Sequence, residues 1–167
     1  LQEQGLPLAL AVLGERFRQE PPVFAQAREQ FAPRIVHWGF AEDYGAYARI
    51  LSACDVVVST AIHEFFGISV VEAALAGCGL LLPKRLSYPE LFPRQFARDR
   101  AQGAFYGDAE DLIERLSAMA VEPRIARKLG EEVRAEASRF CWHVRGPAFD
   151  DALDAAVIAA AEKGIKF

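Results

Sequence analysis

Two glutamates near the middle of the chain have the spacing of a paired acidic site. Seven residues separate Glu64 from Glu72, and most of that segment has the composition of a helix. At about 100° per residue the two side chains lie roughly 80° apart around a helix, so we expect both to face one cleft. One carboxylate can hold sugar hydroxyls or stabilise positive charge at an anomeric carbon. The deeper one can accept two hydrogen bonds from a vicinal diol such as that of ribose.

The neighbours of Glu72 indicate that this carboxylate is partly buried. Val70, Val71, Ala73 and Ala74 surround it in the sequence. A buried carboxylate needs a hydrogen-bonding partner or a ligand. Glutamates eight positions apart are also common on ordinary amphipathic helices, so the apolar context, more than the spacing, favours a binding role.

The loop before this helix carries further groups that could take part in chemistry. It runs from Ser59 to Gly67 and places His63 beside Glu64. The unpaired N–H groups and the dipole of the helix that follows favour an anion such as a diphosphate. His63 could donate to a sugar or a phosphate, or could be a structural hydrogen-bonding residue. Lys84 and Arg85 follow the next apolar strand and could meet a phosphate or the acceptor, or belong to a solvated loop.

Alternating apolar strands and short helices predict a Rossmann-like α/β domain. We expect strands at 6–13, 35–38, 55–58, 79–82 and 104–106, and helices at about 22–32, 42–53, 67–76, 108–119, 123–138 and 147–162. Gly77 is expected to be a left-handed C-cap, and residues 83–103 to be irregular. Such alternation favours right-handed crossovers and a parallel sheet with helices on both faces. Ligands of such sheets bind beyond the carboxyl ends of the strands.

Composition narrows the class of protein. The chain has 167 residues, a net charge of −4, 52% hydrophobic and 25% charged residues, which excludes a disordered chain and fits one domain. Its basic residues are scattered, which disfavours a nucleic-acid grip within this chain, and no apolar stretch is long enough to span a membrane. Cys54, Cys78 and Cys141 are too far apart for a zinc knuckle, and their odd number disfavours a disulfide framework, so we expect a cytoplasmic protein without a metal site.

The segment from Ser59 to Gly77 resembles the E-x7-E signature of retaining, nucleotide-sugar-dependent glycosyltransferases of the GT-B fold, which have two Rossmann-like domains. Within that family, four segments resemble a branch that transfers mannose to queuosine in tRNA: 12–15, 37–40, 63–67 and 83–93. The similarity is strong over roughly residues 8–93 and looser as far as 140–142. We therefore expect the C-terminal half of such an enzyme.

The resemblance implies a role for particular residues. Glu64, with His63, would be catalytic, and Glu72 would hold the nucleotide ribose. The remaining donor-binding residues would be Gly14, Trp38, Gly39, Phe40, Ser59, Phe65, Phe66, Gly67, Ile68 and Lys84. Phe65 stands where the wider family usually has glycine, a departure shared with the queuosine branch.

The resemblance also implies what lies outside the chain. Residues 1–167 would form a single nucleotide-sugar-binding domain, truncated at its N-terminus and lacking the N-terminal acceptor domain. The donor would be GDP-mannose, no other cofactor would be needed, and tRNA would be contacted mainly by the absent domain. This piece alone would bind nucleotide weakly without turnover. Two alternatives are a glycosyltransferase acting on a cell-envelope glycan or lipid and a non-catalytic nucleotide-binding module.

Overall fold

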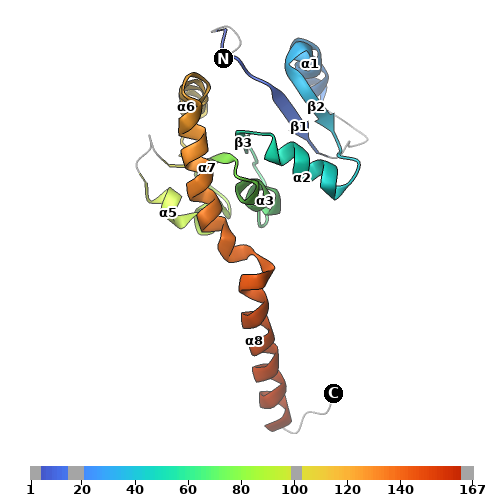
Figure 1. Ribbon diagram of the computed structural model, residues 1–167, viewed down its shortest axis with the longest axis vertical. Coiled ribbons are helices and arrows are strands. Elements are labelled where there is room, and N and C mark those ends of the chain that lie inside the picture. The colour runs from blue at the N-terminus through green and yellow to red at the C-terminus, as the bar shows by residue number, and fades with distance from the viewer. Residues whose placement is uncertain (1–4, 15–20, 99–102, 163–167) are drawn as a thin grey trace.

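Strands and helices alternate along most of the chain, as the sequence predicts. The computed structural model describes residues 5–14, 21–98 and 103–162. The elements (Figure 1) are β1 (Leu10–Leu13), α1 (Pro22–Gln30), β2 (Ile35–Gly39), α2 (Tyr44–Ser52), β3 (Val56–Val58), α3 (Ile68–Ala76), β4 (Gly79–Pro83), α4 (Tyr88–Leu91), α5 (Pro93–Phe96), β5 (Phe105–Tyr106), α6 (Ala109–Val121), α7 (Pro123–Ala137) and α8 (Trp142–Glu162). The predicted α/β class is confirmed.

Every strand pairing in the described part of the chain is parallel. β1 pairs with β2, β3 with β4, and β4 with β5. These pairings form two sheets, β1–β2 and β3–β4–β5, where the sequence analysis expected one. Hydrophobic patterning identifies a strand and its buried faces, but hydrogen-bonded neighbours are chosen by contacts between distant segments. The parallel direction puts the carboxyl ends of strands within each sheet at one edge.

The first strand is shorter than the sequence predicts. The apolar run over 6–13 yields a strand only at Leu10–Leu13, where β2 supplies partners. Leu8 and Leu10 are each 36% exposed, so the beginning of this run is not enclosed by the described residues. An apolar run therefore marks the strand here, and the partner determines its length.

The hydrophobic core surrounds β4. All five residues of this strand are buried, and α3 and α7 both pack against it and against each other. A Cβ at Gly130 of α7 would collide with the backbone carbonyl of Gly77, so the close approach of these two segments requires glycine at position 130. Gly77 has φ +97° and caps α3 in the left-handed conformation, as predicted.

Two regions differ from the sequence prediction. The segment 83–103, expected to be irregular, contains α4 and α5, and its residues 99–102 lie outside the described part. Pro89 and Pro93 lie in the first turns of these helices, where a missing N–H is tolerated. Helix α8 begins at Trp142 and contains Pro147, so the predicted start at that proline was wrong.

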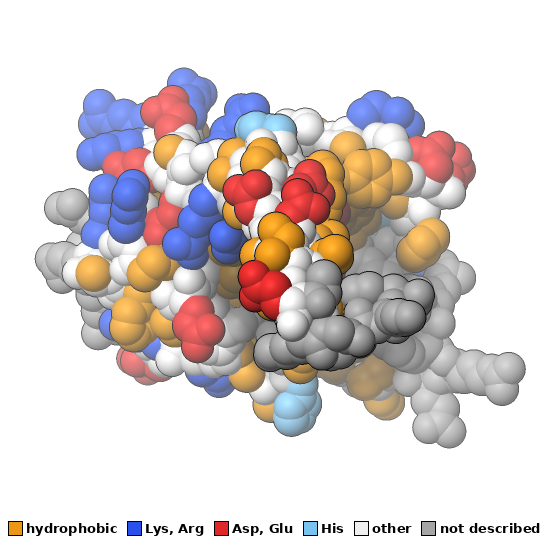
Figure 2. Space-filling model, turned by 90° about the horizontal axis from the view of Figure 1, so that it is seen from below, with side chains coloured by type: hydrophobic (Ala, Val, Ile, Leu, Met, Phe, Trp, Pro, Cys, Tyr) orange, Lys and Arg blue, Asp and Glu red, His pale blue; other side chains and the backbone are white. Residues whose placement is uncertain are grey.

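Helix α8 extends away from the body of the molecule (Figure 1). Hydrophobic side chains along it are exposed, including Phe149, Leu153 and Ile158. Seen from the end toward which α8 projects, hydrophobic and acidic side chains lie next to one another (Figure 2). Among the described residues, none of the helices combines the length and the apolarity that crossing a membrane requires.

Candidate functional site

The loop between β3 and α3 is anchored at its first residue. The side-chain oxygen of Ser59 shares a hydrogen bond of 2.8 Å with the hydroxyl of Tyr88 and accepts one of 3.3 Å from the amide of Ala61. The Tyr106 hydroxyl donates to the carbonyl of Ser59 at 2.8 Å. Ser59 was predicted to bind the donor, and the structure shows it fixing the start of the loop to α4 and β5.

Gly67 ends this loop and is the N-cap residue of α3. Its φ is +98°, a left-handed conformation, and a Cβ there would lie 3.0 Å from the Leu91 side chain and 3.2 Å from the Tyr88 ring. Glycine is therefore required both by the backbone and by the close packing. No side chain caps the N-terminus of α3. Its first backbone N–H groups can therefore act as donors to an anion.

Glu64 lies on the loop just before this helix terminus. Its side chain is half-buried, and Oε1 accepts a hydrogen bond of 2.9 Å from the amide of Phe65. His63 is exposed, and the ring of Phe65 is 99% exposed. Phe66 and Ile68 are also exposed, at 42% and 63%. The structure thus brings these predicted residues together at the open end of α3.

Glu72 is half-buried, as its apolar neighbours predict. Its Oε2 accepts a hydrogen bond of 2.9 Å from the hydroxyl of Tyr47, and its Oε1 lies 3.5 Å from the hydroxyl of Tyr44. A pocket of about 210 Å³ lies where α2 and α3 meet. It is lined by Tyr44, Tyr47, Ala48, Leu51, Ser52, Glu72, Leu75 and Ala76.

The two tyrosines were missed as site residues. Their spacing of three places them on one face of α2 together with Leu51. Leu51 is buried, but Tyr44 remains 71% exposed. The sequence did contain a signal for them, because two tyrosine hydroxyls on one helix face can donate hydrogen bonds to a partly buried polar side chain.

Burial and charge both affect the phenol of Tyr47. Burial, the hydrogen bond to Glu72 and the negative charge of that carboxylate all raise the pKa of Tyr47 far above its usual value. The phenol therefore stays protonated at neutral pH and remains a hydrogen-bond donor. Burial likewise raises the pKa values of Tyr88 and Tyr106 above the ordinary value for tyrosine.

A cation also reaches the loop from the segment after β4. The guanidinium Nε of Arg85 donates to the carbonyl of Ala61 at 3.1 Å, and Ser87 donates to the carbonyl of Phe66 at 2.8 Å. Lys84, the predicted donor-binding cation, and Arg85 are both exposed, but only Arg85 has a hydrogen bond to the loop among the described residues. Of these two cations, which the sequence analysis considered together, Arg85 therefore has the better-defined position beside the loop.

Four more predicted residues lie at the ends of β1 and β2. The amide of Gly14 donates to the carbonyl of Gly39 at 3.2 Å, and Gly39 has φ +113°. The ring of Trp38 packs edge-on against Phe24 of α1, with their centroids 6.5 Å apart. Phe40 is 69% exposed. At the carboxyl ends of β1 and β2, a ligand could therefore contact backbone groups and the Phe40 ring.

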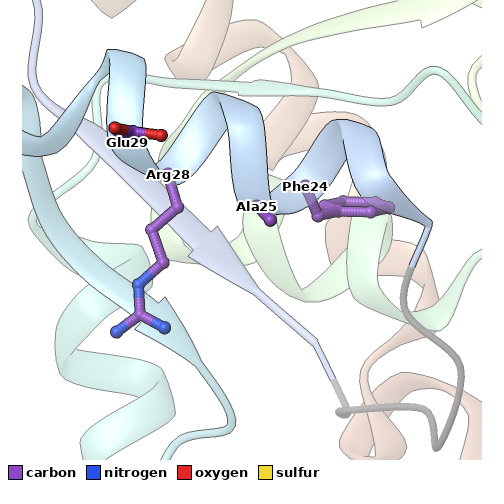
Figure 3. Close-up of a pocket in the computed structure, with 4 residues that line it drawn as sticks. All are labelled: Phe24, Ala25, Arg28 and Glu29. Atoms are coloured by element: carbon purple, nitrogen blue, oxygen red, sulfur yellow. The ribbon is translucent and has the colours of Figure 1, made fainter.

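A second pocket, of about 310 Å³, lies on α1 and includes none of the predicted residues. It is lined by Phe24, Ala25, Arg28 and Glu29. All four side chains come from one helix (Figure 3), so they provide no converging set of groups from separate elements. In the described ranges, no cluster of three or more His, Cys, Asp or Glu residues could hold a metal ion.

Comparisons with known proteins place this geometry in context. No protein-family model matches the chain. Over 128 residues, or 77% of the chain, it is 31% identical to tRNA-queuosine alpha-mannosyltransferase of Drosophila melanogaster, and this match covers 32% of that protein. The chain thus spans about a third of the length of this relative.

Two solved structures share the fold. Sucrose-phosphate synthase from Thermosynechococcus elongatus superposes with a TM-score of 0.71 and 19% identity, over 88% of this chain and 38% of that one. The C-terminal domain of a group 1 family glycosyl transferase from Francisella tularensis superposes with a TM-score of 0.58 and 17% identity, over 77% of this chain and 68% of that one. The chain has the fold of the C-terminal domain of GT-B glycosyltransferases.

Proposed function

We propose that this chain is the donor-binding, C-terminal domain of a retaining glycosyltransferase. One observation carries the proposal: α3 has an uncapped N-terminus next to Glu64 and, further along, Glu72 in the pocket against α2. The same helix therefore offers N–H groups for a diphosphate and carboxylates for hydroxyl groups. The sequence similarity to a mannosyltransferase and the shared GT-B fold support this interpretation.

Each group would act on a different part of a nucleotide-sugar donor. The N–H groups at the start of α3 would stabilise the departing diphosphate, and Gly67, whose missing Cβ faces Leu91 and Tyr88, would maintain the left-handed turn that begins the helix. Glu64 would hold the transferred sugar and stabilise positive charge at its anomeric carbon, with His63 as a neighbouring donor. Glu72 would accept hydrogen bonds from the ribose diol. Transfer would then proceed through an oxocarbenium-like transition state with retained configuration.

The remaining predicted residues would line the rest of the donor site. Backbone groups at Gly14 and from Trp38 to Phe40 would border the nucleobase, while Ser59 would hold the loop in place. Lys84 and Arg85 would be the cations near the phosphate, and Arg85 is the better placed because its guanidinium Nε lies 3.1 Å from the carbonyl of Ala61 in the loop.

The donor we favour is GDP-mannose and the acceptor is queuosine in tRNA, in the cytoplasm. The 31% identity with the Drosophila mannosyltransferase supports both choices. Acceptor binding is assigned mainly to an N-terminal domain outside this chain.

Calorimetric titration of the longest native protein that contains the chain, with GDP-mannose, GDP, UDP-glucose and UDP, tests the donor. Selective binding of GDP-mannose and GDP supports the proposal. Preferential binding of UDP-glucose and UDP would place the protein in another branch of the glycosyltransferases. Binding of none of the four would favour a non-catalytic module.

The acceptor needs a separate experiment. A deletion strain should lose mannose from queuosine-containing tRNA, as measured by mass spectrometry of digested tRNA. Loss of a sugar from a cell-envelope glycan or lipid, with tRNA unchanged, would instead support the alternative acceptor.

A further inference from the structure

The pocket between α2 and α3 is formed by two facing stripes of side chains. On α2, the side-chain oxygen of Asp43 accepts from the amide of Ala46 at 2.6 Å and so determines where the helix starts. Tyr44 and Tyr47 then lie three residues apart on the face toward α3. On α3, Glu72 lies on the facing stripe. A single carboxylate thus meets two phenol hydroxyls across the pocket.

The two hydroxyl groups hold the carboxylate unequally. The Tyr47 hydroxyl lies 2.9 Å from Oε2, the distance of a good hydrogen bond, and its ring is half-buried. The Tyr44 hydroxyl lies 3.5 Å from Oε1, near the limit for a hydrogen bond, and its ring is 71% exposed. One oxygen of Glu72 is therefore firmly bound within the protein, and the other has only a weak, accessible partner.

We propose that Tyr47 is a positioning residue for nucleotide binding: its hydroxyl fixes Oε2 of Glu72, so that Oε1 is presented to a ribose hydroxyl, which replaces the weak contact with Tyr44. This inference rests on the proposed function, in which Glu72 binds the ribose diol. A carboxylate with free torsions would lose side-chain entropy on binding the diol, whereas one already held by Tyr47 loses less. The exposed Tyr44 ring forms the rim of the pocket, tilted 43° to the Tyr47 ring at a centroid distance of 6.0 Å.

The test compares nucleotides with and without ribose hydroxyls. The longest native protein containing the chain is titrated with GDP and with 2′,3′-dideoxy-GDP, and with the uridine pair in parallel. The dissociation constant of the dideoxy nucleotide divided by that of the normal nucleotide measures recognition of the diol. Tyr47→Phe keeps the ring and removes only the donor, so we expect it to reduce this ratio by about fivefold through weaker binding of GDP. Tyr44→Phe is the matched control and should change the ratio by less than about twofold.

Each outcome separates the two hypotheses. If Glu72→Gln abolishes the discrimination between GDP and dideoxy-GDP and Tyr47→Phe reduces it, the ribose-binding role of Glu72 and the positioning role of Tyr47 are both supported. If Glu72→Gln abolishes it while Tyr47→Phe leaves it unchanged, or weakens GDP and dideoxy-GDP equally, the positioning role is wrong and the ribose role survives. An effect of Tyr44→Phe as large as that of Tyr47→Phe also overturns the assignment to Tyr47. If Glu72→Gln leaves discrimination intact, or no nucleotide binds, the ribose role fails and the inference with it.

Discussion

Gly67 packs against the ring of Tyr88 so closely that a Cβ at position 67 would lie 3.2 Å from it. This contact joins the first residue before α3 to α4, and Tyr88 is itself buried at 1% exposure. The same tyrosine holds Ser59 at the other end of the loop. One aromatic residue therefore fixes both ends of the segment that contains Glu64.

Replacing this glycine tests the packing. Gly67→Ala should lower the free energy of unfolding by about 2–3 kcal/mol, because it adds both a left-handed residue with a side chain and a close contact. Gly77→Ala separates the two effects: φ is +97° there, but no atom lies within 4 Å of the position that a Cβ would take, so a loss of about 1 kcal/mol is expected. Denaturant unfolding measures both variants. Equal losses would show that the contact with Tyr88 contributes nothing.

The hydrogen bond between Ser59 and Tyr88 should be visible in a double-mutant cycle. Tyr88→Phe and Ser59→Ala each leave a polar partner without its bond, so each should reduce the free energy of unfolding by about 1–2 kcal/mol. The double variant should lose less than the sum of the two, by about 1 kcal/mol, since the bond can be lost only once. Additive losses in denaturant unfolding would contradict a direct interaction.

The two glutamates should separate in binding and catalysis. Glu72→Ala should weaken nucleotide binding by about 1–3 kcal/mol, because a diol loses its acceptor. Glu64→Gln should leave nucleotide affinity nearly unchanged and reduce the rate of sugar transfer, since its role is at the sugar. Calorimetry and a transfer assay on the longest native protein measure the two effects. Glu114→Gln, an exposed glutamate on α6, is the matched control and should alter neither.

Stability should decline in alkaline solution. Burial raises the pKa of Cys78 from 9.0 to about 11, and the folded state therefore holds the thiol proton more tightly than the unfolded state. The resulting stabilisation is complete below pH 9 and is lost as the pH rises through 11. The loss from this group can reach about 1.4 kcal/mol per pH unit.

Unfolding by denaturant between pH 7 and 11 measures this decline. Cys78→Ala should make the decline of the unfolding free energy with pH shallower above pH 9. Cys141→Ala, which removes a half-buried thiol outside the core cluster, should leave this decline as in the native chain. The same reasoning extends to Tyr47, whose raised pKa adds to the decline above the ordinary tyrosine pKa of 10.0. An unchanged slope in Cys78→Ala would show that its thiol is not the group responsible.

The sequence by itself determined the order of strands and helices apart from α4 and α5, the partial burial of Glu72 and the left-handed cap at Gly77. These features are local: they follow from hydrophobic period, from apolar neighbours and from the freedom of glycine to adopt positive φ. The E-x7-E spacing also located the segment at which the functional interpretation is centred. No knowledge of distant contacts was needed for any of them.

Only the tertiary structure decided which residues surround Glu72 and the loop before α3, and how the strands pair. It paired the strands into two sheets, placed Tyr44 and Tyr47 of α2 against Glu72 of α3, and held Arg85 rather than Lys84 against the loop. Each pairing joins residues more than 20 positions apart in the sequence. Hydrophobic period specifies which face of a helix is buried, but the packing of α2 against α3 specifies which polar group that face meets.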